Sequence, residues 1–561
     1  MASSPIEKNV SAEPPPPEST TTRLTRSAGL VSVGVMGSRV LGLVREQVLA
    51  YLFRPGVELD AFKAAYRIPN LLRDLFAEGA LSKAFVSSFA DVEHREGPEA
   101  GIRLANVVLN VVLLAVGAAT VAGILCSDFI VAHMFFGEGF DVPLPAGEGY
   151  GLASKRELTV HLTRIMFPFL LLVSVAAVVM GILNARGRFG VPAWASAFFN
   201  VGSILVGTAG YVLAPRLGQH PTVGMAVGVV AGGALQLAWQ LPSLFRAGFR
   251  YRPVLSFRDS GLRQVLRTFG PGALSSGTVQ INVFINSMFA SMGEGWVSWI
   301  DLAFRLMHLP IGLIGVAVSM ATLPALSRHA ARKEIEGFRE TFSHAIRLVI
   351  LFTVPASVGL IALSEPIIRL IYERGRFGPD DTHQTAAALV FYAFGLTSYA
   401  AVKIVTDGFY ALQDVRAPLK VSVVSMVVNA MSNWFFISVL GFDHRGLALS
   451  TSVTVTLSFV ALWYLLRRRS GVGRLGGRRT ASLAVKVTLA SIVMGITAFF
   501  VNHSLDGWLG HRGSALQILE VGASLGAALA VLFGACRLLG VSEMDDALRA
   551  FRPRRAGTEV K

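Results

Sequence analysis

Apolar segments recur along the chain from Ala28 to Leu539, and short polar loops separate them. A hydrocarbon core about 30 Å thick requires a helix of about 20 apolar residues, and each segment reaches that length. The pattern predicts fourteen membrane spans, at residues 27–53, 59–90, 103–126, 158–184, 192–214, 222–245, 264–292, 296–327, 341–363, 384–411, 418–440, 446–466, 482–502 and 514–538. We therefore predict an all-α polytopic membrane protein.

The first two segments carry far more charge than membrane spans usually tolerate. One Arg, Lys or Asp at the centre of a span costs roughly 2.5–3.5 kcal/mol on insertion scales. In the second segment the polar positions recur every three or four residues, so they share one helical face within an arc of about 80°. These charged and amide residues are Arg39, Arg45 and Glu46 in the first segment and Asp60, Lys63, Arg67, Asn70, Asp74 and Glu78 in the second, with Arg73 beside the stripe.

Two interpretations of this charge stay open. Ionisable groups inside a membrane usually face a water-filled cavity, which favours a central, net-positive cavity on a substrate path. The alternative is structural: the charges are solvated on an amphipathic pair of helices, or form an ion-pair network that only fixes helix packing.

The composition indicates an integral membrane protein. The 561 residues are 53% hydrophobic and 16% charged, with a mean hydropathy of +0.55, whereas a soluble domain has about 25% charged residues. The net charge of +15 is typical of topogenic Lys and Arg, and no nucleic-acid motif is present. Cys126 and Cys536 lie far apart in apolar sequence, so we expect no disulfide, catalytic residue or metal site.

Charge in the loops predicts the orientation. If the N-terminus is cytoplasmic, the inside loops hold most of the basic residues, for example the arginines at 467–469, and the outside loops hold few, such as Lys155 with Arg156. The exception is the outer loop around Arg374, where acidic residues offset the arginines. The positive-inside rule therefore places both termini in the cytoplasm. We predict a disordered cytoplasmic tail at 1–22, with no cleavable signal, and a second cytoplasmic tail at 541–561.

A weak internal repeat predicts two lobes. The turn NARGRFGVPAW at 184–194 follows the fourth span, and YALQDVRAPLK at 410–420 follows the tenth. An offset of six spans preserves orientation, so the halves should be parallel repeats related by a pseudo-twofold axis along the membrane normal. This predicts a six-helix N-lobe at 23–247, a six-helix C-lobe at 248–466, and two extra helices at 467–540.

The second lobe adds its own charges. The eighth span carries Asp301, Arg305 and His308, and a rise of 1.5 Å per residue places Arg305 near mid-membrane. Lys403 and Asp407 share a face of the tenth span and could form an ion pair, with a purely structural role as the alternative. Guanidinium groups match phosphate oxygens bidentately. A cavity lined in this way should prefer a polyanion such as a diphosphate.

The stretches SRVLGLVREQVLAYLF, DAFKAAYRIPNLLRDLFAEGALSKAFV, FRLMHLPIGLIGVAVSMATLPALSR and DGFYALQDVRAPLKV resemble the MurJ/MviN family of lipid II flippases. This family lies in the MOP superfamily, which also contains the MATE drug exporters. The resemblance implies fourteen helices, facing N- and C-lobes, and alternating access in the bacterial inner membrane. The family moves the undecaprenyl-diphosphate-linked peptidoglycan precursor, lipid II, from the cytoplasmic to the periplasmic leaflet, and the last two spans would form a groove for the lipid tail.

By motif position, the resemblance also implies roles for particular residues. Those expected to bind substrate are Arg39, Arg45, Asn70, Arg73, Arg305 and Lys403. Those expected in a gate or charge network are Glu46, Asp60, Arg67, Glu78 and Asp301. Many members carry Asp where this chain has Glu46 and Phe304. Whether Asp301 supplies the acid missing at Phe304, and what Asp407 does, stay open at this point.

The expected partners are lipid II and membrane lipids, with no nucleic acid and no cofactor, and we expect a monomer. Transport could be coupled to the membrane potential, which is worth about 2.3 kcal/mol per charge per 100 mV, or to Na⁺ or H⁺. One alternative is a cation, drug or other lipid-linked-oligosaccharide exporter of the same superfamily. Another is a membrane glycolipid transferase, which would need metal-binding carboxylates such as the Asp380 and Asp381 pair.

Overall fold

The computed structural model describes residues 20–74, 80–145, 147, 149–469, 473, 477–509 and 513–544, without the side chains of 20–30, 80–83, 271–276, 278, 509 and 514. Within these ranges the chain is helical, and only one isolated bridge, between Pro143 and Ser154, is of β type. The helices are α1 Thr20–Leu52, α2 Glu58–Arg73, α3 Ala80–Glu96, α4 Pro98–Leu125, α5 Ser127–Met134, η2 Glu138–Phe140, α6 Lys155–Met166, α7 Pro168–Ala185, α8 Gly190–Leu213, η3 Ala214–Leu217, α9 Pro221–Arg246, α10 Ser260–Ala290, α11 Trp296–Pro310, η4 Ile311–Gly315, α12 Val316–Ala331, α13 Ile335–Ala362, α14 Ser364–Tyr372, α15 Pro379–Ala393, α16 Leu396–Ala411, α17 Arg416–Trp434, η5 Phe435–Val439, α18 His444–Arg468, α19 Gly477–Leu509 and α20 Ser514–Leu538.

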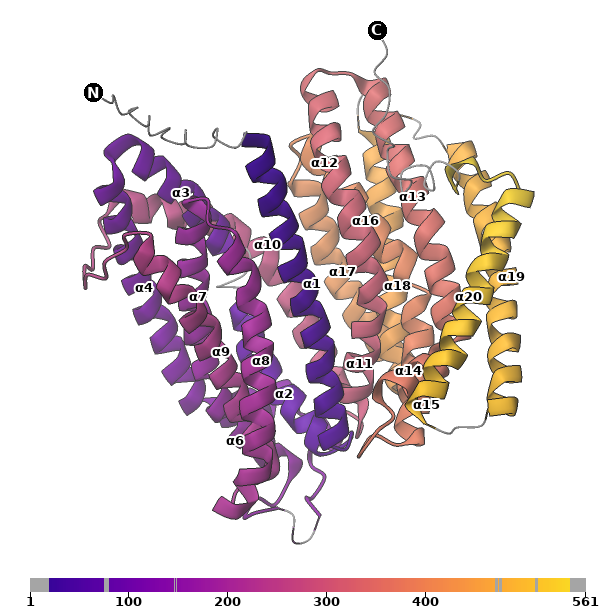
Figure 1. The fold of residues 1–561 in the computed structure, drawn as a ribbon, viewed down its shortest axis with the longest axis horizontal. Helices are drawn as coiled ribbons and strands as arrows, with labels where there is room; N and C mark the ends of the chain where they lie inside the picture. Colours follow the sequence, from indigo (N-terminus) through magenta and orange to yellow (C-terminus); the bar gives the residue numbers. More distant parts are fainter. Residues whose placement is uncertain are drawn as a thin grey trace, which may run out of the picture.

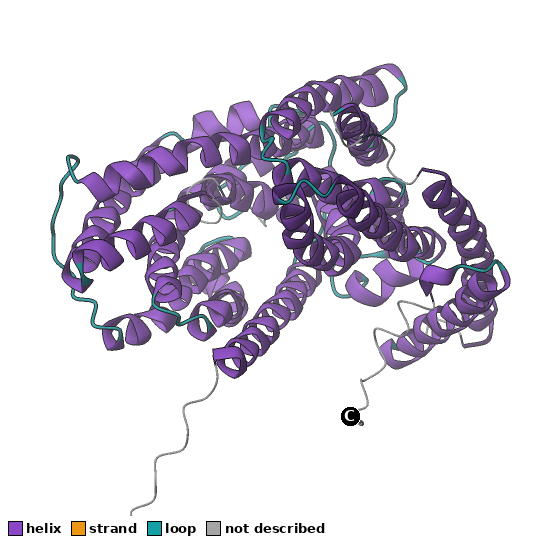
Figure 2. Cartoon of the chain, turned by 90° about the horizontal axis from the view of Figure 1, so that it is seen from above, coloured by secondary structure: helices purple, strands orange, loops and turns teal. Residues whose placement is uncertain are grey.

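The helices form two groups that stand side by side (Figure 1). The N-terminal group holds α1 to α9, the C-terminal group holds α11 to α18, and α19 and α20 pack on the outside of the C-terminal group. We call the end at which α1 begins and α20 ends the upper end, and the opposite end, where α2 and α11 begin, the lower end. Figure 2 shows from above that loops are confined to the connections between helices.

The membrane-spanning character predicted from the sequence is confirmed. Ten helices among the described residues are long and apolar enough to cross a membrane, or eleven if α15 and α16, which meet at a bend of 42°, form one span. The other three predicted spans, 27–53, 59–90 and 264–292, coincide with α1, with α2 and α3, and with α10. The structure is therefore consistent with fourteen spans, and that number stays a prediction.

The apolar cores show where the two groups join. At the lower end one core contains residues of both, such as Phe53 and Phe62 with Val297 and Tyr372. Toward the upper end the cores separate, one within the N-terminal group and one within the C-terminal group. Close van der Waals packing and interhelical hydrogen bonds stabilise the association of membrane helices, so the groups are held together at the lower end and stand apart at the upper end.

Helix α10 contacts both groups. Its first turns bury Leu262 and Val265 in the N-terminal core with Phe85, and its later part packs against α17, where Asn433 donates a hydrogen bond to Asn286 at 2.8 Å. Helix α10 thus connects the two lobes by packing as well as by sequence. The predicted lobe boundary at residue 248 stays a prediction.

Glycines bring α8 and α9 into close backbone contact. A Cβ atom on Gly224 would lie 2.0 Å from the carbonyl carbon of Gly210. We expect Gly224→Ala to destabilise the protein by about 1–3 kcal/mol or more, because the helices must separate to admit the methyl group. Thermal unfolding of the purified protein measures this. The matched control is Gly117→Ala, whose Cβ would meet no atom within 4 Å; equal melting temperatures for both variants would contradict the prediction.

A cationic cavity between the two lobes

A cavity of about 1060 Å³ lies between the two lobes, and residues from both groups line it. On α2 the lining residues are in the last turns, and on α8 they are in the first half, so the cavity occupies the upper half of the molecule. Its charged lining residues in the described part of the chain are all basic: Arg39, Arg45, Arg73, Arg305 and Lys403. No Asp or Glu is among the described lining residues.

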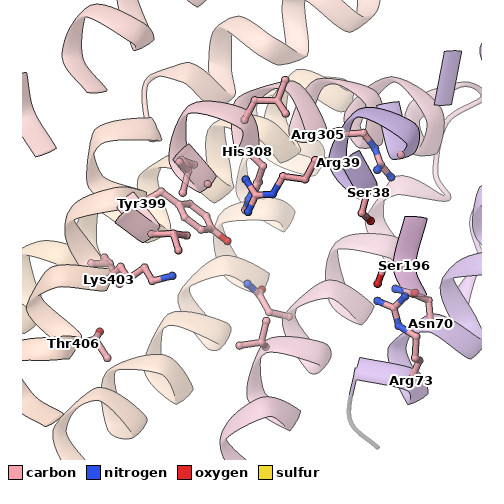
Figure 3. A pocket seen from close by; sticks show the side chains of 18 of the residues that line it. Ser38, Arg39, Asn70, Arg73, Ser196, Arg305, His308, Tyr399, Lys403 and Thr406 are labelled. Carbon is pink, nitrogen blue, oxygen red and sulfur yellow. The ribbon is translucent and has the colours of Figure 1, made fainter. Parts of the chain in front are cut away.

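Helical spacing explains how these side chains reach one space. Asn70 and Arg73 are three residues apart on α2, and Arg305 and His308 are three apart on α11, so each pair shares a face. On α16, Tyr399, Lys403 and Thr406 follow the same spacing. Figure 3 shows Asn70 and Arg73 with Ser196 of α8 on one side of the cavity, and the α16 residues on the other.

All six residues predicted to bind substrate line this cavity: Arg39, Arg45, Asn70, Arg73, Arg305 and Lys403. Their binding role stays a prediction. The sequence analysis missed other polar lining residues, among them Asn200, Gln236, Gln240, Tyr399 and Thr406. Uncharged amides and hydroxyls are common in membrane helices, and only a three-dimensional arrangement could have selected them.

The cavity cations differ in whether a carboxylate already neutralises them. Arg73 pairs with Asp74, with 2.8 Å between Nη2 and Oδ1. By contrast, no ion pair or hydrogen bond joins Arg39 or Lys403 to another described residue. A Cβ on Gly312 would lie 2.6 Å from Nη1 of Arg39, so this guanidinium of α1 reaches the backbone of η4 in the other lobe.

Glu46 is the centre of an ion-pair network at the base of the cavity. Its carboxylate is 2% exposed and lies 3.1 Å from the guanidinium of Arg45, 2.8 Å from Nζ of Lys63 and 3.0 Å from Nη2 of Arg305. Because Arg305 belongs to α11 and the other three residues to α1 and α2, this carboxylate joins the two lobes.

Asp301 extends the network. Its two oxygens lie 2.5 Å from Nζ of Lys63 and 3.0 Å from Nη2 of Arg67. The acid nearest to Arg305 is therefore Glu46 from the other lobe, and Asp301 pairs with α2 instead of replacing the acid missing at Phe304. The predicted network residues Glu46, Arg67 and Asp301 are together here.

Asp60 forms a separate, fully buried junction at the lower end. It lies 2.7 Å from Nζ of Lys155 and accepts hydrogen bonds from the backbone N–H of Gly295 and Ser298 and from the Ser298 hydroxyl. These donors are at the N-terminus of α11, where a negative charge is favourable. Asp60 thus fixes α2 to α11 across the lobes. The sequence analysis placed Lys155 in an outer loop, but its side chain is completely buried.

More contacts close the lower end, including Arg376 with Glu58 at 2.5 Å and Gln47 with the backbone oxygen of Ile371 at 3.1 Å.

Two expectations from the sequence, for Asp407 and for Glu78, have other outcomes. Asp407 makes no ion pair with Lys403 among the described residues; it accepts a hydrogen bond from Ser319 at 2.5 Å, because its carboxylate points toward α12. Glu78 lies outside the described residues.

Comparison with known proteins settles the family. The family described as "Lipid II flippase MurJ" matches residues 49–514. The chain belongs to the MurJ family. It is 34% identical over 528 residues to the "Probable lipid II flippase MurJ" of Vibrio cholerae, which covers 93% of this chain and 97% of that protein. It is 33% identical over 451 residues to the "Lipid II flippase MurJ" of Burkholderia cenocepacia, which covers 80% and 84%.

Solved structures share the fold of this MurJ family member. A lipid II flippase MurJ in an inward closed conformation superimposes with a TM-score of 0.71 at 24% identity, over 91% of this chain and 99% of that one. An inward-facing MATE multidrug transporter of the MOP superfamily superimposes with a TM-score of 0.66 at 17% identity, over 82% of this chain and 98% of that one. The predicted all-α fold is therefore confirmed.

Proposed function

We propose that this MurJ family member is a lipid II flippase, a transporter and not an enzyme, that moves lipid II from the cytoplasmic to the periplasmic leaflet of the bacterial inner membrane. The observation that carries the proposal is the cavity between the lobes, whose charged lining in the described residues is entirely basic and comes from both lobes. Such a space suits a polyanionic head group, since an ionised group without a partner is very costly in hydrocarbon.

The diphosphate would bind where cations have no protein counter-ion. Among the described residues, Arg39 and Lys403 meet this condition from opposite lobes, and Arg305 and Arg45 lie at the base of the cavity. Arginine can hold two phosphate oxygens at once, whereas lysine acts as a point charge. The polyprenyl tail would stay in the lipid, and the predicted tail groove of α19 and α20 is supported by their apolar, exposed outer faces.

The two ends of the molecule suggest how access alternates. We assign the upper end to the cytoplasm, because the basic loops of the sequence are on that side, and the lower end to the periplasm. In this conformation the Glu46 network and the Asp60 junction close the lower end. Rocking of one lobe against the other would break these contacts and open the cavity to the opposite side, as in other transporters built from repeats. Both termini would then be cytoplasmic.

Movement of a charged head group responds to the membrane potential, at about 2.3 kcal/mol per charge per 100 mV. We therefore propose coupling to this potential, with Na⁺ or H⁺ as the alternative, and action as a monomer. A cation or drug exporter is the second candidate because of the MATE-like fold. The basic cavity opposes it, since five cationic side chains repel a cationic substrate.

Lipid II binding tests the proposal. We expect Arg39→Gln and Lys403→Met each to weaken lipid II binding by about tenfold to a hundredfold, since a hydrogen bond to a charged group contributes about 1.5–3 kcal/mol. Thermal stability should not fall, because neither cation forms an ion pair with a described carboxylate. Native mass spectrometry of the purified protein with lipid II, a neutral polyprenol and an organic cation measures the preference, and vesicle reconstitution measures transport.

The matched control is Arg216→Gln, an exposed arginine of η3 that does not line the cavity. It should bind lipid II as the wild type does. Preference of the wild type for the organic cation, or equal lipid II binding by all variants, would contradict the proposed function.

A further inference from the structure

The N-lobe side of the cavity is lined by uncharged hydrogen-bonding side chains that the cationic site does not use. Gln236 and Gln240 lie one turn apart on α9, and Asn200 lies on the neighbouring helix α8. Helices α8 and α9 pack directly against each other through their glycines, and all three amides line the same cavity. We call Asn200, Gln236 and Gln240 the amide wall.

Gln240 shows what the amide wall lacks. The side chain is 1% exposed, and its Nε2 donates to the backbone oxygen of Gln236 at 3.1 Å. That partner can only accept, which fixes the orientation of the amide and leaves Oε1 as the other atom. Oε1 is buried, and no described residue donates a hydrogen bond to it. A buried acceptor left without a donor costs about 1–3 kcal/mol, so buried polar atoms nearly always have a hydrogen-bond partner.

Asn200 repeats the arrangement on α8. Its Nδ2 donates to the backbone oxygens of Ser38 at 3.1 Å and Ser196 at 3.2 Å, and again both partners can only accept. Its Oδ1 therefore stays an acceptor, and no described residue donates to it. Two helices thus present amide oxygens at the cavity wall while their N–H groups are occupied.

Amide oxygens of this kind can bind only those parts of the substrate that donate hydrogen bonds. A diphosphate carries only acceptor oxygens at neutral pH, so it cannot satisfy Oε1 of Gln240 or Oδ1 of Asn200. Sugar hydroxyl and acetamido N–H groups are donors and can. In lipid II the sugars are attached directly to the diphosphate. A diphosphate held by Arg39 and Lys403 therefore places the sugars, before the peptide stem, next to the surrounding walls.

We propose that the amide wall is a sugar-binding subsite, distinct from the cations that bind the diphosphate. This assignment rests on the proposed function. The cavity then has two binding parts. Cations from both lobes bind the diphosphate, and uncharged amide oxygens of the N-lobe accept hydrogen bonds from the sugars. Gln240 is its central residue, because its oxygen is fully buried and its orientation is fixed.

The experiment compares three lipids that differ only in the head group: undecaprenyl diphosphate, undecaprenyl diphosphate carrying one N-acetylated sugar without a peptide, and lipid II. Binding of each to the purified full-length protein is titrated for the wild type and for Gln240→Met, which keeps the length of the side chain and removes its hydrogen bonds. The control is Gln219→Met, at an exposed position outside the cavity.

We expect the wild type to bind both sugar-bearing lipids more tightly than the bare diphosphate. Gln240→Met should weaken binding of both sugar-bearing lipids by about tenfold, the effect of one well-formed hydrogen bond in a dry site, and leave binding of undecaprenyl diphosphate unchanged. Arg39→Gln should weaken all three alike. Gln219→Met should change none.

Other results overturn the subsite. If Gln240→Met weakens binding of all three lipids equally, the role of Gln240 is structural. If it weakens binding of none of them, Gln240 does not contact the substrate. A loss confined to lipid II would move the contact to the peptide stem. If Gln240→Met does not fold, Gln236→Met provides the same test, because no hydrogen bond of the described residues involves the Gln236 side chain. Failure of the wild type to bind any of the three lipids would refute the proposed function instead.

Discussion

Glu46→Gln is expected to open the lower end of the molecule and to abolish complementation of a strain depleted of its own MurJ. The neutral amide would leave Arg45, Lys63 and Arg305 in a buried cluster with Asp301 as the one remaining acid among the described partners. Removing one partner from a buried ion pair costs about 3–5 kcal/mol. About 5.5 kcal/mol converts a 1:99 equilibrium into 99:1, so this loss is large enough to reverse a moderate preference for the closed lower end.

The shift is measured as a distance across the lower end. Spin labels at the exposed positions Arg54 of the N-lobe and Arg374 of the C-lobe, in a background without Cys126 and Cys536, report the separation of the lobes. We expect the longer distance to dominate in Glu46→Gln and the wild-type distance to return in Glu46→Asp, which restores the charge.

Glu365→Gln is the matched control, because Glu365 forms a half-exposed pair with Arg369 on α14, and such pairs contribute about 0–1 kcal/mol. If Glu46→Gln retains the wild-type distance and supports growth, Glu46 does not hold the lower end closed.

Helical periodicity explains how the sequence predicted the polar face of α2. The spacing of three and four residues on α2 places Asp60, Lys63, Arg67 and Asn70 on one face whatever the tertiary structure is. In the structure this face turns toward the other lobe. Arg39, Arg305 and Lys403 lie on three other helices and line the cavity with Asn70.

The sequence could not show that the roles along this face change with depth. At the lower end Asp60 binds the first turn of α11. One and two turns higher, Lys63 and Arg67 bind Asp301. A third turn higher, Asn70 lines the cavity. Each role is set by the group that the opposite helix presents at that depth. That register depends on packing between lobes, which no periodicity within one helix encodes.

Lys155 illustrates the same limit. In the sequence it is a loop lysine next to Arg156, and both counted as outer-loop charge. In the structure Arg156 pairs with the exposed Asp141, whereas Lys155 is buried against Asp60 and the ring of Phe140. Neighbouring residues with the same charge have opposite environments because α6 begins at Lys155, and only the side of its first turns that carries Lys155, Leu158 and Thr159 faces the core.

Asp60→Asn is expected to produce the largest loss of stability of any single substitution considered. Asp60 and Lys155 are both completely buried, and the carboxylate also accepts three hydrogen bonds from Gly295 and Ser298. An amide NH₂ in place of one oxygen would face the Lys155 ammonium and the Gly295 N–H, so donors would meet donors. The buried ammonium would lose its counter-ion, at a cost of about 3–5 kcal/mol.

A double-mutant cycle separates this ion pair from the rest of the junction. Lys155→Met removes the stranded charge and keeps an unbranched side chain, so Asp60→Asn with Lys155→Met should melt at a higher temperature than Asp60→Asn alone. Recovery should be incomplete, because the helix α11 donors still lose the carboxylate charge. Asp128→Asn, which breaks a largely exposed pair with Arg164, should leave the melting temperature nearly unchanged. A double variant no more stable than Asp60→Asn would show that the α11 cap, and not the Lys155 pair, dominates the junction.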